Sequence, residues 1–331
     1  MKSSESGRRV RESRQHRRKH RPREAFTRTN FSRLPGSGEP GKSGLVASIP
    51  PFLHLLHSSL RNLVYHLPVH SLSYTTSGAG GHPVLFLHGF MGRSEDWEGI
   101  SAGLGKGFRS IAVDLPGHGN SLGLPEEAYT MEGAANAAIR TLDELGIETA
   151  SLAGYSMGGR LALYFALRFS ERCERLFLES SSPGLKTEEE RIVRRKADEE
   201  KAKRLETGDF EAFLEEWYRM PLFATLDDGV VKSLIEKRRG NAPSELAKSL
   251  RGMGTGSQPS LWEELENLRA PMLAVAGELD RKFVGIARGM AERSSRISIQ
   301  ITPGAGHNVR VEAPGEYSKL LGEFLEAGKL K

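Results

Sequence analysis

Short apolar runs alternate with amphipathic stretches along most of the chain, from about residue 72 onward. Stretches such as 131–146 and 314–328 place apolar residues at the spacing of a helix face. Since strands that alternate with helices are typical of a mostly parallel sheet covered by helices, the pattern predicts an α/β fold. Runs rich in aliphatic and β-branched residues predict its strands at 72–76, 83–89, 109–114, 150–155, 174–180, 271–277 and 297–301.

The alternation stops between about residues 184 and 255. Two stretches there, 187–220 and 227–253, are predicted to be helical with no strand between them. Open α/β sheets bind their ligands beyond the carboxyl ends of the strands, and this insertion follows the predicted strand at 174–180. We therefore expect one α/β domain over residues 71–331, with a helical lid at about 184–255.

The beginning of the chain differs from the rest in charge. Residues 1–50 hold 13 Lys and Arg against 4 Glu, a local charge of +9 within a total of +5, which leaves −4 for the remainder. This favours a basic, unstructured N-terminal extension over residues 1–70, and it argues against a nucleic-acid-binding domain because the basic residues are not on a patterned fold. An organellar transit peptide is the alternative to a cytoplasmic location.

Membrane, disulfide and cofactor chemistry find little support in the sequence. The apolar stretch 52–67 is interrupted by His and Arg and falls short of the ~20 apolar residues that a spanning helix needs. A single cysteine, Cys173, excludes an intramolecular disulfide. The histidines lack the spacing of a metal cluster, and no phosphate-binding loop is present, so we expect neither a metal nor a cofactor.

The stretch "GYSMG", residues 154–158, fits the pattern G-x-S-x-G. A predicted strand runs into it and an apolar helix runs out, which is the context in which this pattern forms a sharp turn that presents a nucleophilic serine. We therefore predict that Ser156 is catalytic, against the alternative of an ordinary serine in a glycine-rich turn.

A serine hydroxyl needs a base, and in this class of sheet the partners follow in the order Ser, acid, His. His307 is the only one of ten histidines that follows Ser156, which makes it the candidate base. Asp280 and Glu278 follow the predicted strand at 271–277. We choose Asp280 as the acid because it lies further into the loop, and Glu278 is the fallback.

Two backbone amides and one arginine complete the candidate site. The amide of Met157, directly after the serine, and that of Phe90, in the loop after an early strand, are the expected oxyanion donors. Arg160 lies four residues after Ser156, one helical turn further on the same face. It either faces the substrate cavity or pairs with a glutamate of the lid.

The motifs "HGFMG", "DLPGHGNS", "GYSMGG", "GELD" and "GAGHN" follow one another as in the α/β-hydrolase superfamily, which the chain resembles from about residue 72 to 328. The lid segments "SSPGLKTEEERIVRRKADEE", "WYRMPLF", "RRGN" and "LRGMGTGSQPSLW" make it similar to the 2-succinyl-6-hydroxy-2,4-cyclohexadiene-1-carboxylate synthases of menaquinone biosynthesis. That resemblance implies a lyase which removes a proton from its substrate and expels pyruvate.

The resemblance also implies roles for particular residues. It assigns the triad to Ser156, Asp280 and His307, and the oxyanion amides to Phe90 and Met157. It further implies that a small polycarboxylate substrate is bound by Arg160, Arg194, Arg238, Tyr155 and Trp217.

Three other functions remain open at this point. A serine hydrolase of esters or carbon–carbon bonds would use the same triad, but a hydrolase of neutral esters has little use for Arg160. A ligand sensor of the same fold has no need of a complete triad. A nucleic-acid binder would depend on residues 1–50. The oligomeric state is not predicted.

Overall fold

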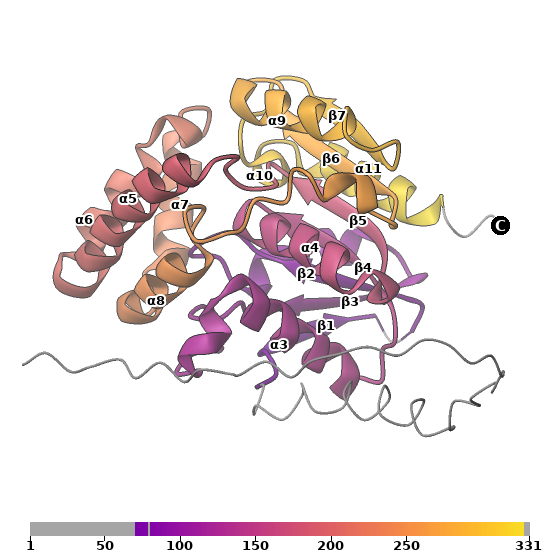
Figure 1. Ribbon diagram of the computed structural model, residues 1–331, viewed down its shortest axis with the longest axis horizontal. Coiled ribbons are helices and arrows are strands. Elements are labelled where there is room, and N and C mark those ends of the chain that lie inside the picture. Colours follow the sequence, from indigo (N-terminus) through magenta and orange to yellow (C-terminus); the bar gives the residue numbers. More distant parts are fainter. Residues whose placement is uncertain (1–69, 79, 328–331) are drawn as a thin grey trace, which may run out of the picture. The chain divides into compact units, whose positions relative to one another are not determined.

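The computed structural model describes residues 70–78 and 80–327, and it contains one seven-stranded sheet in the order β1-β3-β2-β4-β5-β6-β7 (Figure 1). β1 is antiparallel to β3, and every other neighbouring pair is parallel. The predicted α/β fold and all seven predicted strands are confirmed, while the expected N-terminal extension, up to residue 69, lies outside the described residues. The strands are β1 Tyr74–Ser77, β2 His82–Leu87, β3 Phe108–Val113, β4 Ala150–Tyr155, β5 Cys173–Glu179, β6 Met272–Gly277 and β7 Ile297–Thr302.

Helices cover both faces of the sheet because its central strands are apolar on both sides. Along β2, Leu85 and Leu87 join one buried cluster while Val84 and Phe86 join the other, which is the alternation that a pleated strand imposes. The first cluster is completed by α3 Met131–Glu144, α4 Met157–Arg168 and α9 Arg281–Ala291, and the second by α2 Glu98–Gly103 and α11 Pro314–Glu326. The short helix α10 Val309–Glu312 precedes α11.

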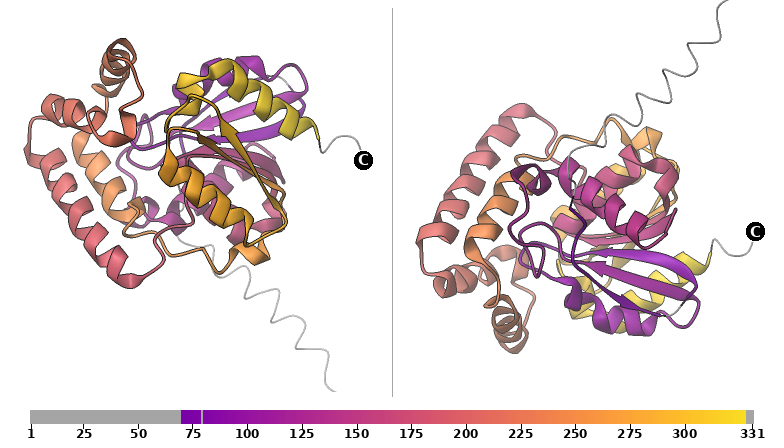
Figure 2. Two further views of the ribbon diagram at one scale, coloured as in Figure 1. Left: turned by 90° about the horizontal axis from the view of Figure 1, so that it is seen from above. Right: turned by 90° about the horizontal axis from the view of Figure 1, so that it is seen from below.

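Four α-helices stand between β5 and β6 and form a group beside the sheet (Figures 1 and 2). We call them the helical insertion: α5 Glu188–Thr207, α6 Phe210–Tyr218, α7 Asp228–Arg238 and α8 Pro243–Met253. They share an apolar cluster of their own that includes Met91, from the loop after β2. The insertion therefore packs over the carboxyl ends of the strands, where the candidate site residues lie.

Each of the two predicted helical stretches is divided in two. Asp209 caps α6, because its carboxylate accepts hydrogen bonds from the amides of Glu211 and Ala212. Pro243 occupies the first turn of α8, a position where its missing N–H costs nothing. These local signals set the boundaries within the insertion.

Candidate active site

Ser156 lies in a tight turn between β4 and α4, with φ 50° and ψ −108°, a conformation that is strained for a residue with a side chain. Its amide donates a hydrogen bond to the carbonyl of Glu179 at 2.9 Å, and its carbonyl accepts one from the amide of Arg160 at 3.0 Å. Gly158 is required here because a Cβ at this position would lie 2.1 Å from the Leu87 carbonyl oxygen. The start of α4 is thus packed directly against the end of β2.

The structure brings Ser156, His307 and Asp280 together. His307 Nδ1 lies 2.7 Å from Asp280 Oδ2, and its Nε2 lies 3.4 Å from Ser156 Oγ. Donation from Nδ1 to the carboxylate leaves Nε2 free to accept the serine proton, which is the tautomer that a general base needs. The serine contact is long for a hydrogen bond, and contacts of this kind shorten in the complex with substrate.

The second acidic candidate has a different place. Glu278 Oε2 accepts a hydrogen bond from the amide of Gly304 at 3.0 Å, on the far side of the turn. Asp280 instead caps α9 with Oδ1, which accepts from the Phe283 amide at 3.2 Å, while its Oδ2 holds the imidazole. The geometry therefore favours Asp280 over Glu278 as the partner of His307.

The two expected oxyanion amides lie on neighbouring segments. Met157 is the first residue of α4, so its amide has no partner within the helix. Phe90 lies in a turn closed by the hydrogen bond from the Gly92 amide to the Gly89 carbonyl at 2.9 Å. His88 supports this turn: its Nδ1 contacts the Gly89 carbonyl at 2.7 Å, and its Nε2 accepts from the Leu115 amide. Burial lowers the pKa of His88 to about 4, which keeps the ring neutral in this role.

Arg160 is buried in the first turn of α4, and its hydrogen-bond partners are neutral. Its Nη1 donates to the Met253 carbonyl and to Gln258 Oε1, both at 2.8 Å. Burial, with a further contribution from the nearby positive charge of Arg194, lowers the pKa of Arg160 to about 9. Among the described residues no glutamate of the lid pairs with Arg160, so that alternative is not met.

Arg194 and Asp198 are the charged neighbours of Arg160. Arg194 Nε lies 2.7 Å from Asp198 Oδ1, one turn further along α5. Arg194 pairs with this carboxylate, whereas Asp198 acts on Arg160 through its charge alone, so the three groups together carry one positive charge in excess. A buried excess charge of this kind favours the binding of an anion.

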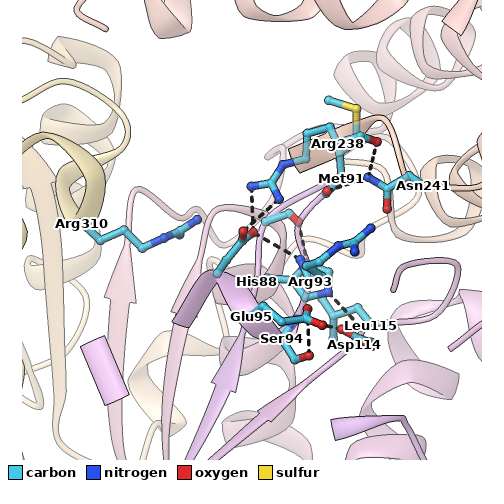
Figure 3. A network of polar contacts seen from close by, with 12 residues as sticks. His88, Met91, Arg93, Ser94, Glu95, Asp114, Leu115, Arg238, Asn241 and Arg310 are labelled. Carbon is cyan, nitrogen blue, oxygen red and sulfur yellow. Dashed lines mark hydrogen bonds and ion pairs between the residues drawn. The ribbon is translucent and has the colours of Figure 1, made fainter. Parts of the chain in front are cut away.

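Arg238 belongs to a different group of residues from Arg160 and Arg194, although the sequence resemblance places all three arginines in one set of substrate ligands. It forms a two-pronged pair with Asp96, with Nη1 to Oδ1 at 2.9 Å and Nη2 to Oδ2 at 2.7 Å. Arg238 lowers the pKa of the Asp96 carboxyl. This guanidinium lies among the polar contacts shown in Figure 3, and its charge is matched by Asp96.

The two expected aromatic residues lie next to the turn that carries Phe90. Trp217 packs its ring 5.2 Å from that of Phe90, and Tyr155 packs 5.6 Å from the ring of His307. A small cavity of about 20 Å³ lies between these elements and is lined by Gly89, Phe90, Gly92, Tyr155, Tyr218, Phe223, Arg238, Asn308 and Arg310. Residues of the helical insertion thus line this cavity together with the turn that carries Phe90.

Sequence reasoning missed several residues of this region. Gln258 holds Arg160, Asp96 neutralises Arg238, and Arg310 lines the small cavity three residues after His307. Gln258 lies inside a lid segment that the sequence marks, whereas Asp96 and Arg310 lie just beyond "HGFMG" and "GAGHN", and only the folded chain shows what each side chain contacts. Within the part of the chain that the structure describes, no three His, Cys, Asp or Glu side chains are grouped to hold a metal ion.

Comparisons with known proteins show which family the chain resembles. Residues 82–314 match the family described as the alpha/beta hydrolase fold. A Bacillus subtilis protein named putative 2-succinyl-6-hydroxy-2,4-cyclohexadiene-1-carboxylate synthase is 38% identical over 246 residues, which cover 73% of this chain and 89% of that protein. The Arabidopsis thaliana protein PHYLLO, chloroplastic, is 35% identical over 295 residues, 84% of this chain and 17% of that one.

Among solved structures, that of MenH from S. aureus is 33% identical and superimposes with a TM-score of 0.74, covering 77% of this chain and 98% of that chain. Family match, curated relatives and solved structure point the same way. The chain belongs to the α/β-hydrolase family, in the group of 2-succinyl-6-hydroxy-2,4-cyclohexadiene-1-carboxylate synthases.

Proposed function

We propose that this protein eliminates pyruvate from 2-succinyl-5-enolpyruvyl-6-hydroxy-3-cyclohexene-1-carboxylate to give 2-succinyl-6-hydroxy-2,4-cyclohexadiene-1-carboxylate, a step of menaquinone biosynthesis. Relatives that carry the name of this activity support the reaction class. The observation that carries the proposal to this chain is Arg160, a buried guanidinium whose hydrogen-bond partners are neutral. The substrate has three carboxylates, and such a guanidinium is suited to one of them.

The chemistry needs a base and an acceptor for negative charge. His307, oriented by Asp280, polarises the Ser156 hydroxyl, and this pair removes the proton from the ring carbon that carries the succinyl group. The ring double bond then shifts, the bond from the ring to the enolpyruvyl oxygen breaks, and the released enolate takes up a proton to become pyruvate.

Negative charge develops on the succinyl carbonyl oxygen as the proton leaves. The amides of Phe90 and Met157 stabilise this oxygen, and each donor of this kind contributes about 3 kcal/mol in the transition state. No covalent intermediate is required, so Ser156 acts as part of the base. This distinguishes the proposed reaction from acyl transfer by the same set of groups.

The helical insertion acts as a lid that carries part of the binding surface. Arg194 lies on α5, Trp217 on α6 and Arg238 at the end of α7. Since these three side chains and Arg160 come from elements on opposite sides of the site, closure of the lid would surround a polycarboxylate and exclude water.

The same triad also supports ester hydrolysis, which is the second candidate function. The distances among Ser156, His307 and Asp280 are those that a serine hydrolase requires. Pyruvate elimination and ester hydrolysis differ in the role of Arg160, because a neutral ester has no carboxylate for this guanidinium to bind. A sensor that binds without turnover has no need of the intact triad.

The decisive experiment is a product assay on the purified protein. The precursor is generated in place by the preceding enzyme of the pathway, pyruvate release is followed, and short-chain nitrophenyl esters are tested in parallel. We expect pyruvate release far above the spontaneous rate, loss of most of it in Ser156→Ala, and no change in Ser298→Ala, which alters an exposed serine on β7.

Arg160→Ala extends the same assay to substrate binding. The lost charged contacts should lower kcat/KM by roughly 10- to 100-fold, mainly through KM, while Arg160→Lys should lower it less. Arg168→Ala, at the exposed end of the same helix, is the matched control. Efficient ester cleavage without acceleration of pyruvate release would make the protein a hydrolase.

We further propose a cytoplasmic location. Within residues 70–78 and 80–327, none of the helices combines the length and the apolar character that a bilayer-spanning segment requires. The alternative is an organellar location, which the similarity to a plant protein named as chloroplastic supports. A fluorescent protein fused behind residues 1–70 separates the two, since a transit peptide would carry it into an organelle.

A further inference from the structure

Arg310 is the buried arginine next to the site that no motif singles out. It lies on α10, three residues after His307, and its side chain is only 4% exposed. Its guanidinium carbon stacks over the ring of Tyr155 at 4.0 Å and faces that of Trp97 at 4.8 Å. These two ring contacts fix the plane of the guanidinium beside Tyr155, which directly precedes Ser156 in the chain.

The polar contacts of Arg310 are incomplete. Its Nη1 lies 3.6 Å from Glu179 Oε2, and neither atom makes a hydrogen bond within the described part of the chain. Burial raises the pKa of Glu179 to about 7, so this carboxyl is a weak counter-ion near neutral pH. Arg238 differs, because Asp96 takes up its charge through two contacts. A buried donor without a partner is costly, and a ligand that accepts from it removes the cost.

Arg310 also forms part of the wall between two cavities. The cavity of about 20 Å³ on the inner side adjoins Phe90 and Tyr155. A larger one of about 380 Å³ lies on the outer side, within the size range of ligand sites. Arg238 and Arg310 are the two residues that line both cavities. Figure 3 shows these two guanidinium groups approaching each other from different elements.

The charges change from the inner to the outer cavity. The inner cavity is lined by the two arginines and by no carboxylate. The outer cavity has three carboxylates in its lining, Glu95, Asp96 and Glu98, beside the two arginines and Lys237. An anion is therefore attracted more strongly to the inner cavity than to the outer one, where the carboxylates offset the cations. This gradient suits a small anion that is held during the reaction and released afterwards.

We propose that Arg310, through Nη1, binds the carboxylate of the three-carbon group that is expelled from the substrate, and that this 2-oxo acid leaves through the outer cavity. The inference rests on the proposed function for the identity of the anion. It assigns one of the three substrate carboxylates to Arg310 and leaves the group of Arg160 and Arg194 to serve the others.

The test measures pyruvate itself as a ligand and as a product inhibitor. Titration calorimetry gives its affinity for the wild-type protein, Arg310→Gln and Arg310→Lys, and the product assay gives its inhibition constant. We expect Arg310→Gln to weaken pyruvate binding and to lower kcat/KM by roughly 10- to 100-fold, and Arg310→Lys to lie between. Arg175→Gln, which alters an arginine stacked on Phe324, is the matched control.

Equal pyruvate affinity in the wild type and in folded Arg310→Gln would overturn the inference, as would a wild type that does not bind pyruvate. If Arg310→Gln does not fold, the double variant Glu179→Gln/Arg310→Met removes both partners of the pair and keeps the comparison open. Should the wild type fail to release pyruvate from the precursor while still binding pyruvate through Arg310, the proposed function fails and the anion site stands.

Discussion

At the scale of single residues, the two carboxylates after β6 differ by what they contact. Asp280 holds the His307 ring, whereas Glu278 holds the backbone of Gly304. Asp280→Asn should lower kcat for pyruvate release by roughly 10²- to 10⁴-fold, because an amide orients the imidazole poorly and gives no charge to its protonated form. Glu278→Gln should stay near the wild type. Steady-state kinetics of the two variants decide the matter, and a larger loss in Glu278→Gln would reverse the assignment.

Residues marked by a turn pattern or by their order along the chain could be proposed from the sequence, and residues marked only by what they contact could not. Ser156 and His307 are proposed from a turn pattern and from chain order, and the structure places the two side chains 3.4 Å apart. Arg310 could not be found in this way, since its significance comes from an unpartnered Nη1 and from two cavities. The sequence carries no signal for an unsatisfied donor.

At the scale of elements, the approach of α4 to β2 sets the position of the oxyanion amides. Gly158→Ala would place a Cβ 2.1 Å from the Leu87 carbonyl oxygen and must push the two elements apart. We expect a loss of about 1–3 kcal/mol in the free energy of unfolding and a fall in kcat, since Met157 moves with the helix.

The matched variant for this prediction is Gly322→Ala on α11. No atom lies within 4 Å of the Cβ position there, so alanine should stabilise the helix by about 0.4–1 kcal/mol and leave kcat unchanged. Urea unfolding and the product assay on both variants test the pair. A Gly158→Ala protein as stable and active as the wild type would show that the approach of α4 is not constrained.

Element types were easier to predict than the boundaries within the insertion. The seven strands follow from apolar runs of suitable length, because strands buried on both faces need apolar residues at successive positions. In the insertion, charged residues dominate α5, and its apolar contacts with α8 come from a few positions such as Ala202, Leu205, Leu246 and Leu250. The boundary between α5 and α6 depends on the single capping residue Asp209, and the start of α8 depends on Pro243. A hydrophobic pattern read over the whole stretch 187–220 or 227–253 does not resolve such single-residue signals.

At the scale of the whole molecule, buried titratable groups couple stability to pH. Burial lowers the pKa of His88 to about 4 and that of His118 to about 3, from 6.5 in the unfolded chain. Below pH 6.5 the unfolded chain therefore binds two protons that the folded chain does not, and stability falls. Glu179 acts in the opposite direction, because its pKa of about 7 exceeds the unfolded value of 4.5 and the folded chain holds its proton.

Between pH 6.5 and 4.5 the difference is one proton, so the free energy of unfolding should fall by about 1.4 kcal/mol per pH unit. Two variants should change this slope in opposite directions. His118→Leu removes one of the two histidine contributions and should make the slope nearly flat, while Glu179→Gln removes the opposing one and should roughly double it. Urea unfolding at a series of pH values, followed by circular dichroism, measures the slopes whatever the absolute stabilities. Parallel slopes in all three proteins would mean that these side chains do not keep the protonation states that their burial implies.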